Sequence, residues 1–138
     1  MAARKSKKQV RRFQRVAEQR LEEAAFLLDH EYTNASVYLA GYAVECSLKA
    51  LILASEPAKQ HVGTVESFRG AVAHDYSWLK HQLRIRGVVL PRPVERLLTQ
   101  VAGWSTDLRY AVAKTERKVG EQFLSATQAI VAWANGRI

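Results

Sequence analysis

The chain has 138 residues, of which 48% are apolar and 25% are charged, and this fits a single globular domain with one core. Its one cysteine, Cys46, excludes an intrachain disulfide framework and a metal cluster held by several thiolates. Almost all of the net charge of +8 comes from the first fifteen residues, which hold seven basic side chains and no acidic one. No apolar segment follows this basic start, so we expect no signal peptide and a cytoplasmic protein.

Residues 1–11 are expected to form a basic, disordered arm. Such an arm can bind nucleic acid by displacing counterions, or it can serve only as a solubilising tail. Both alternatives stay open from the sequence. The candidate contacts to nucleic acid are Arg4, Lys5, Lys7, Lys8, Arg11 and Arg12.

Two helices are predicted next, joined by a short connection that makes them an antiparallel hairpin. Apolar residues from Phe13 to Leu28 recur at helical spacing, which predicts an amphipathic helix over about residues 9–29. Thr33 or Asn34 is expected to cap the second helix by accepting its free N–H groups. That helix, residues 35–54, is apolar nearly all round and lacks helix breakers, so we expect it to be buried on several sides.

One line along the helix of residues 35–54 is polar: Tyr38, Tyr42, Glu45 and Lys49 follow one another at spacings of four, three and four. Glu45 precedes Lys49 by four residues, the favourable order for an ion pair. These two charges also make a membrane span expensive, so we interpret the segment as the central helix of a soluble bundle. The line is either a solvated stripe or part of a ligand site.

The rest of the chain also indicates helices. A loop with a possible helical turn is expected from residue 55 to about 73, and Asp75 should then cap a helix that Gly87 ends. Further helices are predicted over residues 93–104 and from about residue 119 to Asn135 and Gly136, with residues 105–118 forming a helix end and a loop. The fold class is therefore all-α: an antiparallel four-helix-type bundle with additional short helices.

Common catalytic and cofactor signatures are missing from the sequence. It has no glycine-rich phosphate loop and no HExxH motif, and its four histidines lack the spacing of metal ligands. We therefore expect no metal and no cofactor. The pair His74–Asp75 is interpreted as a helix cap in preference to a catalytic element.

Three segments together resemble the HEPN domain family: the hairpin EEAAFLLDHEYTNASVYLAGYAVECSLKALILA, the later HDYSWL, and WSTDLRY. The resemblance implies a single helical domain over residues 12–138 that usually forms a homodimer. The family includes metal-independent ribonucleases, toxins of toxin–antitoxin pairs, and non-catalytic modules that act beside a small nucleotidyltransferase. Its active members share an Arg followed, after four to six residues, by a His. The Arg can stabilise phosphate charge and the His can transfer protons.

This chain departs from that motif. Arg109 fits the arginine by position, but Lys114, Thr115 and Glu116 stand where the histidine is expected. An unperturbed lysine is a poor base at neutral pH. Arg109 and Tyr110 are thus either structural, with Arg109 paired to a carboxylate such as Glu45, or part of a ligand site. The candidate residues for binding a ligand or RNA are Tyr38, Tyr42, Glu45, Lys49, Arg109, Tyr110 and Lys114, and Arg109 is also the candidate catalytic residue.

The leading hypothesis is a homodimeric HEPN-like binding module of a toxin–antitoxin or nucleotidyltransferase-associated system. Its expected partners are a second copy of the chain, an antitoxin or small nucleotidyltransferase, and RNA or a nucleotide. A second hypothesis is a ribonuclease that uses Arg109 with an unusual proton-transfer group. A third is a purely structural bundle within a larger assembly.

Overall fold

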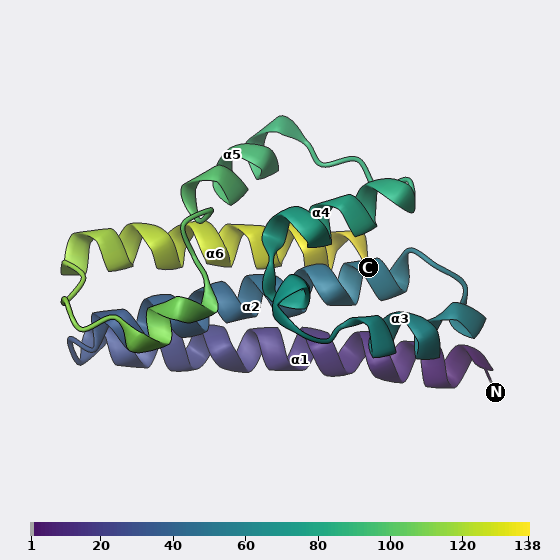
Figure 1. The fold of residues 1–138 in the computed structure, drawn as a ribbon, viewed down its shortest axis with the longest axis horizontal. Coiled ribbons are helices and arrows are strands. Elements are labelled where there is room, and N and C mark those ends of the chain that lie inside the picture. The colour runs from purple at the N-terminus through teal and green to yellow at the C-terminus, as the bar shows by residue number, and fades with distance from the viewer. Residues whose placement is uncertain (1) are drawn as a thin grey trace.

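The computed structural model describes the backbone of residues 2–138 and the side chains of residues 7–138. Within these residues every regular element is helical, so the all-α prediction is confirmed (Figure 1). The α-helices are α1 (Ala2–Asp29), α2 (Thr33–Ala54), α3 (His61–Ser67), α4 (Tyr76–Ile85), α5 (Arg92–Gln100) and α6 (Arg117–Arg137). Short 3₁₀ helices are η1 (Ala58–Gln60), η2 (Ala71–His74) and η3 (Thr106–Tyr110).

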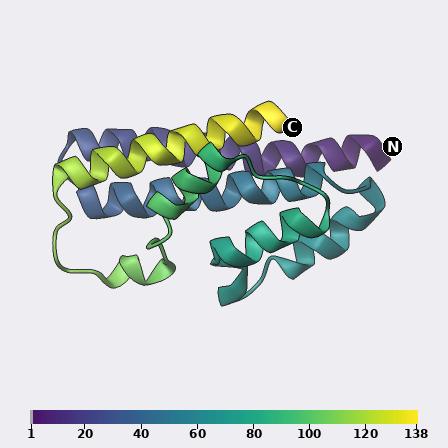
Figure 2. The ribbon, with the colours of Figure 1, turned by 90° about the horizontal axis from the view of Figure 1, so that it is seen from above.

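Three long helices form the body of the bundle. Figures 1 and 2 show α1, α2 and α6 running side by side, and each of them contacts the other two. Helix α4 packs on α2, and α5 packs on α6, so the two shorter helices cover the face of the body that α1 leaves free. Because α2 touches α1, α4 and α6, it is the central helix that its composition predicts.

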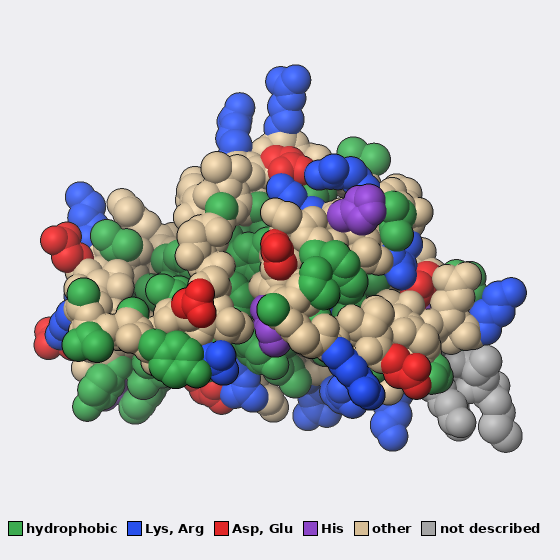
Figure 3. Space-filling model, viewed as in Figure 1, with side chains coloured by type: hydrophobic (Ala, Val, Ile, Leu, Met, Phe, Trp, Pro, Cys, Tyr) green, Lys and Arg blue, Asp and Glu red, His purple; other side chains and the backbone are tan. Residues whose placement is uncertain are grey.

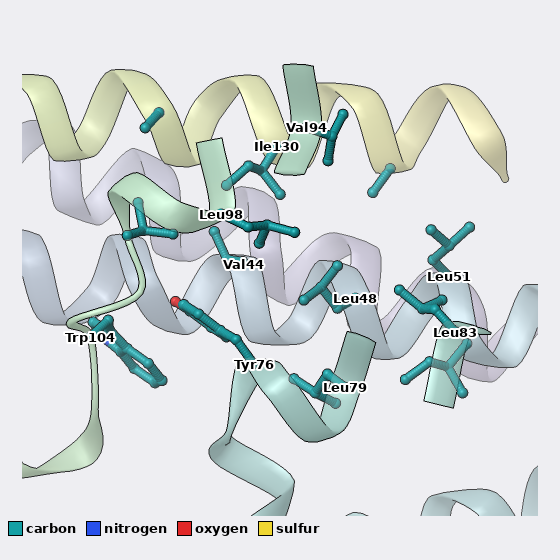
Figure 4. Packing of buried hydrophobic residues seen from close by; sticks show 14 residues of the cluster. Val44, Leu48, Leu51, Tyr76, Leu79, Leu83, Val94, Leu98, Trp104 and Ile130 are labelled. Carbon is teal, nitrogen blue, oxygen red and sulfur yellow. The ribbon is translucent and has the colours of Figure 1, made fainter. Parts of the chain in front are cut away.

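The main core lies where α2 meets α4, α5 and α6. Figure 4 shows side chains from all four helices meeting there, with Trp104 beside Tyr76 at one end. The labelled members on helices are Val44, Leu48 and Leu51 of α2, Tyr76, Leu79 and Leu83 of α4, Val94 and Leu98 of α5, and Ile130 of α6. The spacings of three and four residues between them are those of one helix face.

Helix α2 is long and apolar enough to span a membrane, with 22 residues and a mean hydropathy of 1.5 over its most apolar stretch. However, 78% of that stretch is buried inside the bundle. Protein side chains therefore already cover the surface that lipid would need to contact.

Two signals of the sequence are confirmed in α4. Asp75 caps the helix, because its Oδ1 accepts a hydrogen bond of 2.8 Å from the backbone N–H of Ser77. Gly87 follows the helix with a φ of 80°, the left-handed conformation that glycine adopts without steric cost.

Other predicted boundaries were wrong. Helix α1 begins at Ala2 and not at about residue 9, so Lys7 and Lys8 lie on the same helix as Arg11 and Arg12. Buried Val10 explains this, since it packs with Ala50 and Leu53 and anchors the first turns. The side chains of Arg4 and Lys5 lie outside the described residues. Helix α5 ends earlier than predicted, at Gln100, and α6 continues through Asn135 and Gly136 to Arg137.

Candidate functional site: a polar groove backed by a buried ion pair

The polar line of α2 faces the interior of the bundle. Glu45 is completely buried, and its Oε2 accepts a hydrogen bond of 2.8 Å from Nζ of Lys49, whose side chain is only 6% exposed. Lys49 Nζ also lies 5.2 Å from the centroid of the Phe68 ring, a cation–π contact. The interpretation of a solvated stripe is therefore wrong. A buried ion pair of this kind is tolerated only when its remaining polar atoms also find partners.

The second oxygen of Glu45 finds its partner in His74, at the end of η2. His74 Nδ1 lies 2.7 Å from Glu45 Oε1, and because a carboxylate only accepts, Nδ1 carries the proton of this bond. The His74 side chain is 37% exposed, so its Nε2 is the atom left for contacts outside the pair. A histidine oriented by a buried carboxylate has a fixed ring and a fixed tautomer. The alternative in which Arg109 pairs with Glu45 is not observed, because Lys49 and His74 occupy both carboxylate oxygens.

His74 opens onto a polar groove of about 490 Å³ between η2, α4, α5 and the segment that leads into η3. This volume lies in the range of small-molecule sites. Beside His74, the groove presents Lys80, two carboxylates and several hydroxyl groups. The polar lining residues are His74, Asp75, Ser77, Lys80, Thr99, Ser105, Thr106 and Asp107.

An aromatic stack forms the apolar wall of this groove. The rings of Tyr76 and Trp104 lie parallel, with centroids 5.3 Å apart, and both are nearly buried. The Tyr76 hydroxyl donates to the carbonyl of Gly41 at 2.6 Å, and Trp104 Nε1 donates to the carbonyl of Tyr38 at 3.0 Å. Gly41 is needed here, because a Cβ at this position would overlap the indole ring of Trp104. Gly41 thus allows the Tyr76–Trp104 stack to pack directly against the backbone of α2.

Burial changes the acid–base behaviour of three groups around this network. Burial raises the pKa of the Cys46 thiol to about 12, and the nearby Glu45 carboxylate adds to the rise. The pKa of Tyr76 is raised well above its usual value, again through burial first and Glu45 second. Burial also raises the pKa of Tyr42. These groups stay neutral at physiological pH and act as structural members of the core.

The two tyrosines of the polar line are also held in the bundle. Tyr38 is half-buried and stacks on Trp104, with ring centroids 6.0 Å apart. Tyr42 is half-buried and packs against both the main core and a second cluster that contains Ala43 and Cys46. Neither tyrosine is among the residues that line the groove.

Arg109 and Tyr110 lie on the outer surface of η3. Arg109 Nε donates to the carbonyl of Thr106 at 2.9 Å, and its guanidinium lies 5.4 Å from the centroid of the Tyr110 ring. Thr106 lines the groove, whereas Arg109 does not. Lys114 is exposed in the segment that follows η3.

Thr33 and Asn34 do not cap α2, contrary to the prediction, since no side-chain cap is present at that end. They bind the segment after η3. Thr33 Oγ1 donates to the carbonyl of Thr115 at 2.6 Å, Asn34 Nδ2 donates to the carbonyl of Ala113 at 2.9 Å, and Asn34 Oδ1 accepts from the Thr115 N–H at 2.8 Å. This extended segment of the chain is therefore fixed on the start of α2.

Of the candidate residues, the structure joins Glu45 and Lys49 directly and leaves Arg109, Tyr110 and Lys114 on the surface. The role of His74, which lies 29 residues from Glu45 in the chain, was not predicted from the sequence. The available signal was the polar pair His74–Asp75 directly before an amphipathic helix. Within residues 7–138, no group of three or more His, Cys, Asp or Glu side chains is arranged to hold a metal ion.

Comparison with known proteins gives one match. No curated protein and no solved structure matches the chain significantly. The family model of the HEPN domain matches residues 10–137, which is nearly the whole chain and includes every residue of the groove. The chain therefore belongs to the HEPN domain family.

Proposed function

We propose that this protein is an RNA-binding HEPN module that takes a nucleotide of single-stranded RNA into the groove beside His74. The observation that carries this proposal is the Glu45–His74 pair, which fixes an imidazole at the groove surface with its Nε2 free for a ligand. Burying a carboxylate and an ammonium costs desolvation energy, and this cost supports a functional role for the side chain that they position, His74.

The groove offers the groups that a nucleotide needs. His74 Nε2 and the ammonium of Lys80 can bind a phosphate. Lys80 Nζ lies 3.3 Å from Glu95 Oε2, in a weak ion pair that a phosphate can replace. Carboxylates and hydroxyls such as Asp107 and Ser105 can bind the ribose hydroxyls and the donors of a base edge. The 2′-hydroxyl is the group by which proteins distinguish RNA from DNA.

Binding is tested with a fluorescent single-stranded RNA pool and two matched variants. His74→Gln keeps the size of the side chain but loses the imidazole, whereas His81→Gln removes an exposed histidine outside the groove. A lost hydrogen bond to a charged phosphate is worth about 1.5–3 kcal/mol, so His74→Gln should weaken binding by about tenfold or more. His81→Gln should bind as the wild type does. Equal affinity of both variants would contradict the proposed site.

A second candidate function is metal-independent RNA cleavage, with His74 as the proton-transfer group and Arg109 as the phosphate ligand. The contact between His74 and Glu45 favours it, because a carboxylate-oriented histidine is suited to acid–base chemistry. Against it, Arg109 lies outside the groove lining and is held by the carbonyl of Thr106.

We therefore expect no more than trace cleavage when a mixed RNA pool is incubated with the protein in the absence of metal. Arg109→Ala and His74→Gln are the matched variants. Robust cleavage by the wild type that disappears in both variants would make the ribonuclease the leading function.

The proposal includes a homodimer. Large apolar side chains are exposed near the end of the α1–α2 hairpin, where Figure 3 shows apolar groups gathered at the lower left. They are Phe26, Tyr32, Tyr110 and Val112, and Val112 is 96% exposed. Light scattering should give twice the monomer mass of 15.5 kDa. Val112→Asp should shift the protein towards monomer without unfolding it, and a monomeric wild type at high micromolar concentration would contradict the dimer.

Membership of the family also supports a partner protein, either an antitoxin or a small nucleotidyltransferase, in the cytoplasm. Co-purification of the native protein followed by mass spectrometry identifies both bound protein and bound nucleic acid. A neighbouring gene for a small nucleotidyltransferase would support this association, and recovery of the protein without any partner would count against it.

A further inference from the structure

The N-terminal half of α1 carries a cationic face that is separate from the groove. Five basic side chains, Lys7, Lys8, Arg11, Arg12 and Arg15, are all exposed and surround a shallow hollow of about 700 Å³. At 100° per residue they lie within an arc of about 140° on one side of the helix. We call these five residues the basic face.

The basic face is not neutralised by the rest of the described chain. None of its five side chains takes part in an ion pair among residues 7–138, although Arg20, further along the same helix, pairs with Glu23 at 2.6 Å. The first acidic residue of α1 is Glu18, after the face has ended. The charge is therefore available to an external polyanion.

The basic face is held on a rigid support. Val10, on the opposite side of the same turns, is buried against Ala50 and Leu53 of α2. Arg12 also lies over the ring of Phe13, with its guanidinium carbon 5.2 Å from the ring centroid. Cations fixed in this way lose less conformational freedom on binding than cations on a disordered tail.

We infer that the basic face binds the phosphate backbone of a nucleic acid strand, and this inference rests on the proposal that the protein binds RNA. From Lys7 to Arg15 the helix rises about 12 Å, so the basic face is long enough to contact more than one phosphate of a strand. Three of the five cations are arginines, whose planar guanidinium groups bind phosphate oxygens in pairs.

An anionic membrane fits the basic face less well than a nucleic acid. Helices that lie in a membrane interface need bulky apolar side chains such as Trp, Phe or Leu beside their cations. Among residues 7–138, the other residues that line the hollow are Val16 and Gln19, and Val16 is half-buried.

The test compares two triple variants that remove the same charge. Arg11→Gln/Arg12→Gln/Arg15→Gln alters the basic face, and glutamine maintains helix propensity. The matched control, Arg84→Gln/Arg92→Gln/Arg96→Gln, removes three exposed arginines from α4 and α5. Affinity for single-stranded RNA is measured from 50 to 300 mM salt, and affinity for anionic vesicles is measured in parallel.

The basic-face variant should bind RNA at least tenfold more weakly, and the slope of log affinity against log salt should fall by about 2, since each lost phosphate contact contributes about 0.7. The control should retain the wild-type slope. Equal losses in both variants, no loss in either, or a basic-face effect limited to vesicles would overturn the inference.

The same RNA assay separates this inference from the proposed groove. Weakened binding in the basic-face variant with normal binding in His74→Gln would support the basic face and contradict the groove. The reverse pattern would support the groove and overturn the inference drawn here from α1.

Discussion

Replacing Glu45 by glutamine removes one charge from the interior and leaves the other behind. The side chains of Glu45 and Lys49 are 1% and 6% exposed, so in Glu45→Gln the ammonium of Lys49 stays buried without a counter-charge. Breaking a buried pair in this way costs about 3–5 kcal/mol, whereas replacing both partners by neutral groups is often nearly harmless. A domain with a total stability of about 5–15 kcal/mol loses a large fraction of it.

Urea unfolding followed by tryptophan fluorescence measures this effect. A loss of 3–5 kcal/mol should lower the urea midpoint by about 1–5 M at the usual slopes of about 1–3 kcal/mol per M of urea. The double variant Glu45→Gln/Lys49→Met removes both charges and should recover most of that loss. Such recovery is the sign that the cost comes from an unpaired charge and not from disturbed packing.

The matched control uses a pair with the same spacing on the surface. Arg117 Nε and Glu121 Oε1 are 3.0 Å apart, also four residues apart on one helix, but both side chains are about half exposed. Glu121→Gln should therefore cost less than about 0.5 kcal/mol. If Glu45→Gln is as mild as Glu121→Gln, or if the double variant is less stable than Glu45→Gln, the account of a buried pair is wrong.

Three further predictions concern the surroundings of this pair. Gly41→Ala should destabilise the protein by about 1–3 kcal/mol in urea unfolding, because its Cβ displaces Trp104, whereas Gly63→Ala has free space and should be neutral or stabilising. Asn34→Ala should speed hydrogen exchange at the Thr115 amide, because this amide donates a hydrogen bond to Asn34 Oδ1 in the wild type. Stability should fall as pH rises from about 9 towards 12, since the unfolded chain releases the Cys46 proton first and the folded chain retains it to about 12. Cys46→Ala should reduce that fall, and Tyr42 and Tyr76 account for the remainder.

Local signals were enough to predict most of the fold. The apolar composition of residues 35–54 predicts a central helix because its burial on several sides follows from the lack of a polar face. The cap at Asp75 and the turn at Gly87 depend on one or two neighbouring residues, so they can be read from the sequence directly. Such features require no knowledge of what the segment packs against.

Two of the wrong predictions involve contacts between distant residues. Thr33 and Asn34 have the composition of helix caps, but their side chains bind backbone atoms of residues 113 and 115. The start of α1 depends on the contact of Val10 with Ala50 and Leu53, some forty residues away. A local propensity for a helix cap or a helix start is weaker than one well-placed tertiary contact.

The candidate site shows the same limit for function. The spacing of Glu45 and Lys49 predicts that they pair. The same spacing fits a solvated stripe and a buried pair, and the packing of α4 and η2 on α2 is what makes the pair buried. Once the pair is buried, neither charge is accessible to a ligand. Their influence reaches the surface through His74, whose Nδ1 is bound to Glu45 and whose ring borders the groove. In the function proposed above, Glu45 and Lys49 are therefore positioning groups, and His74 is the group that the ligand contacts.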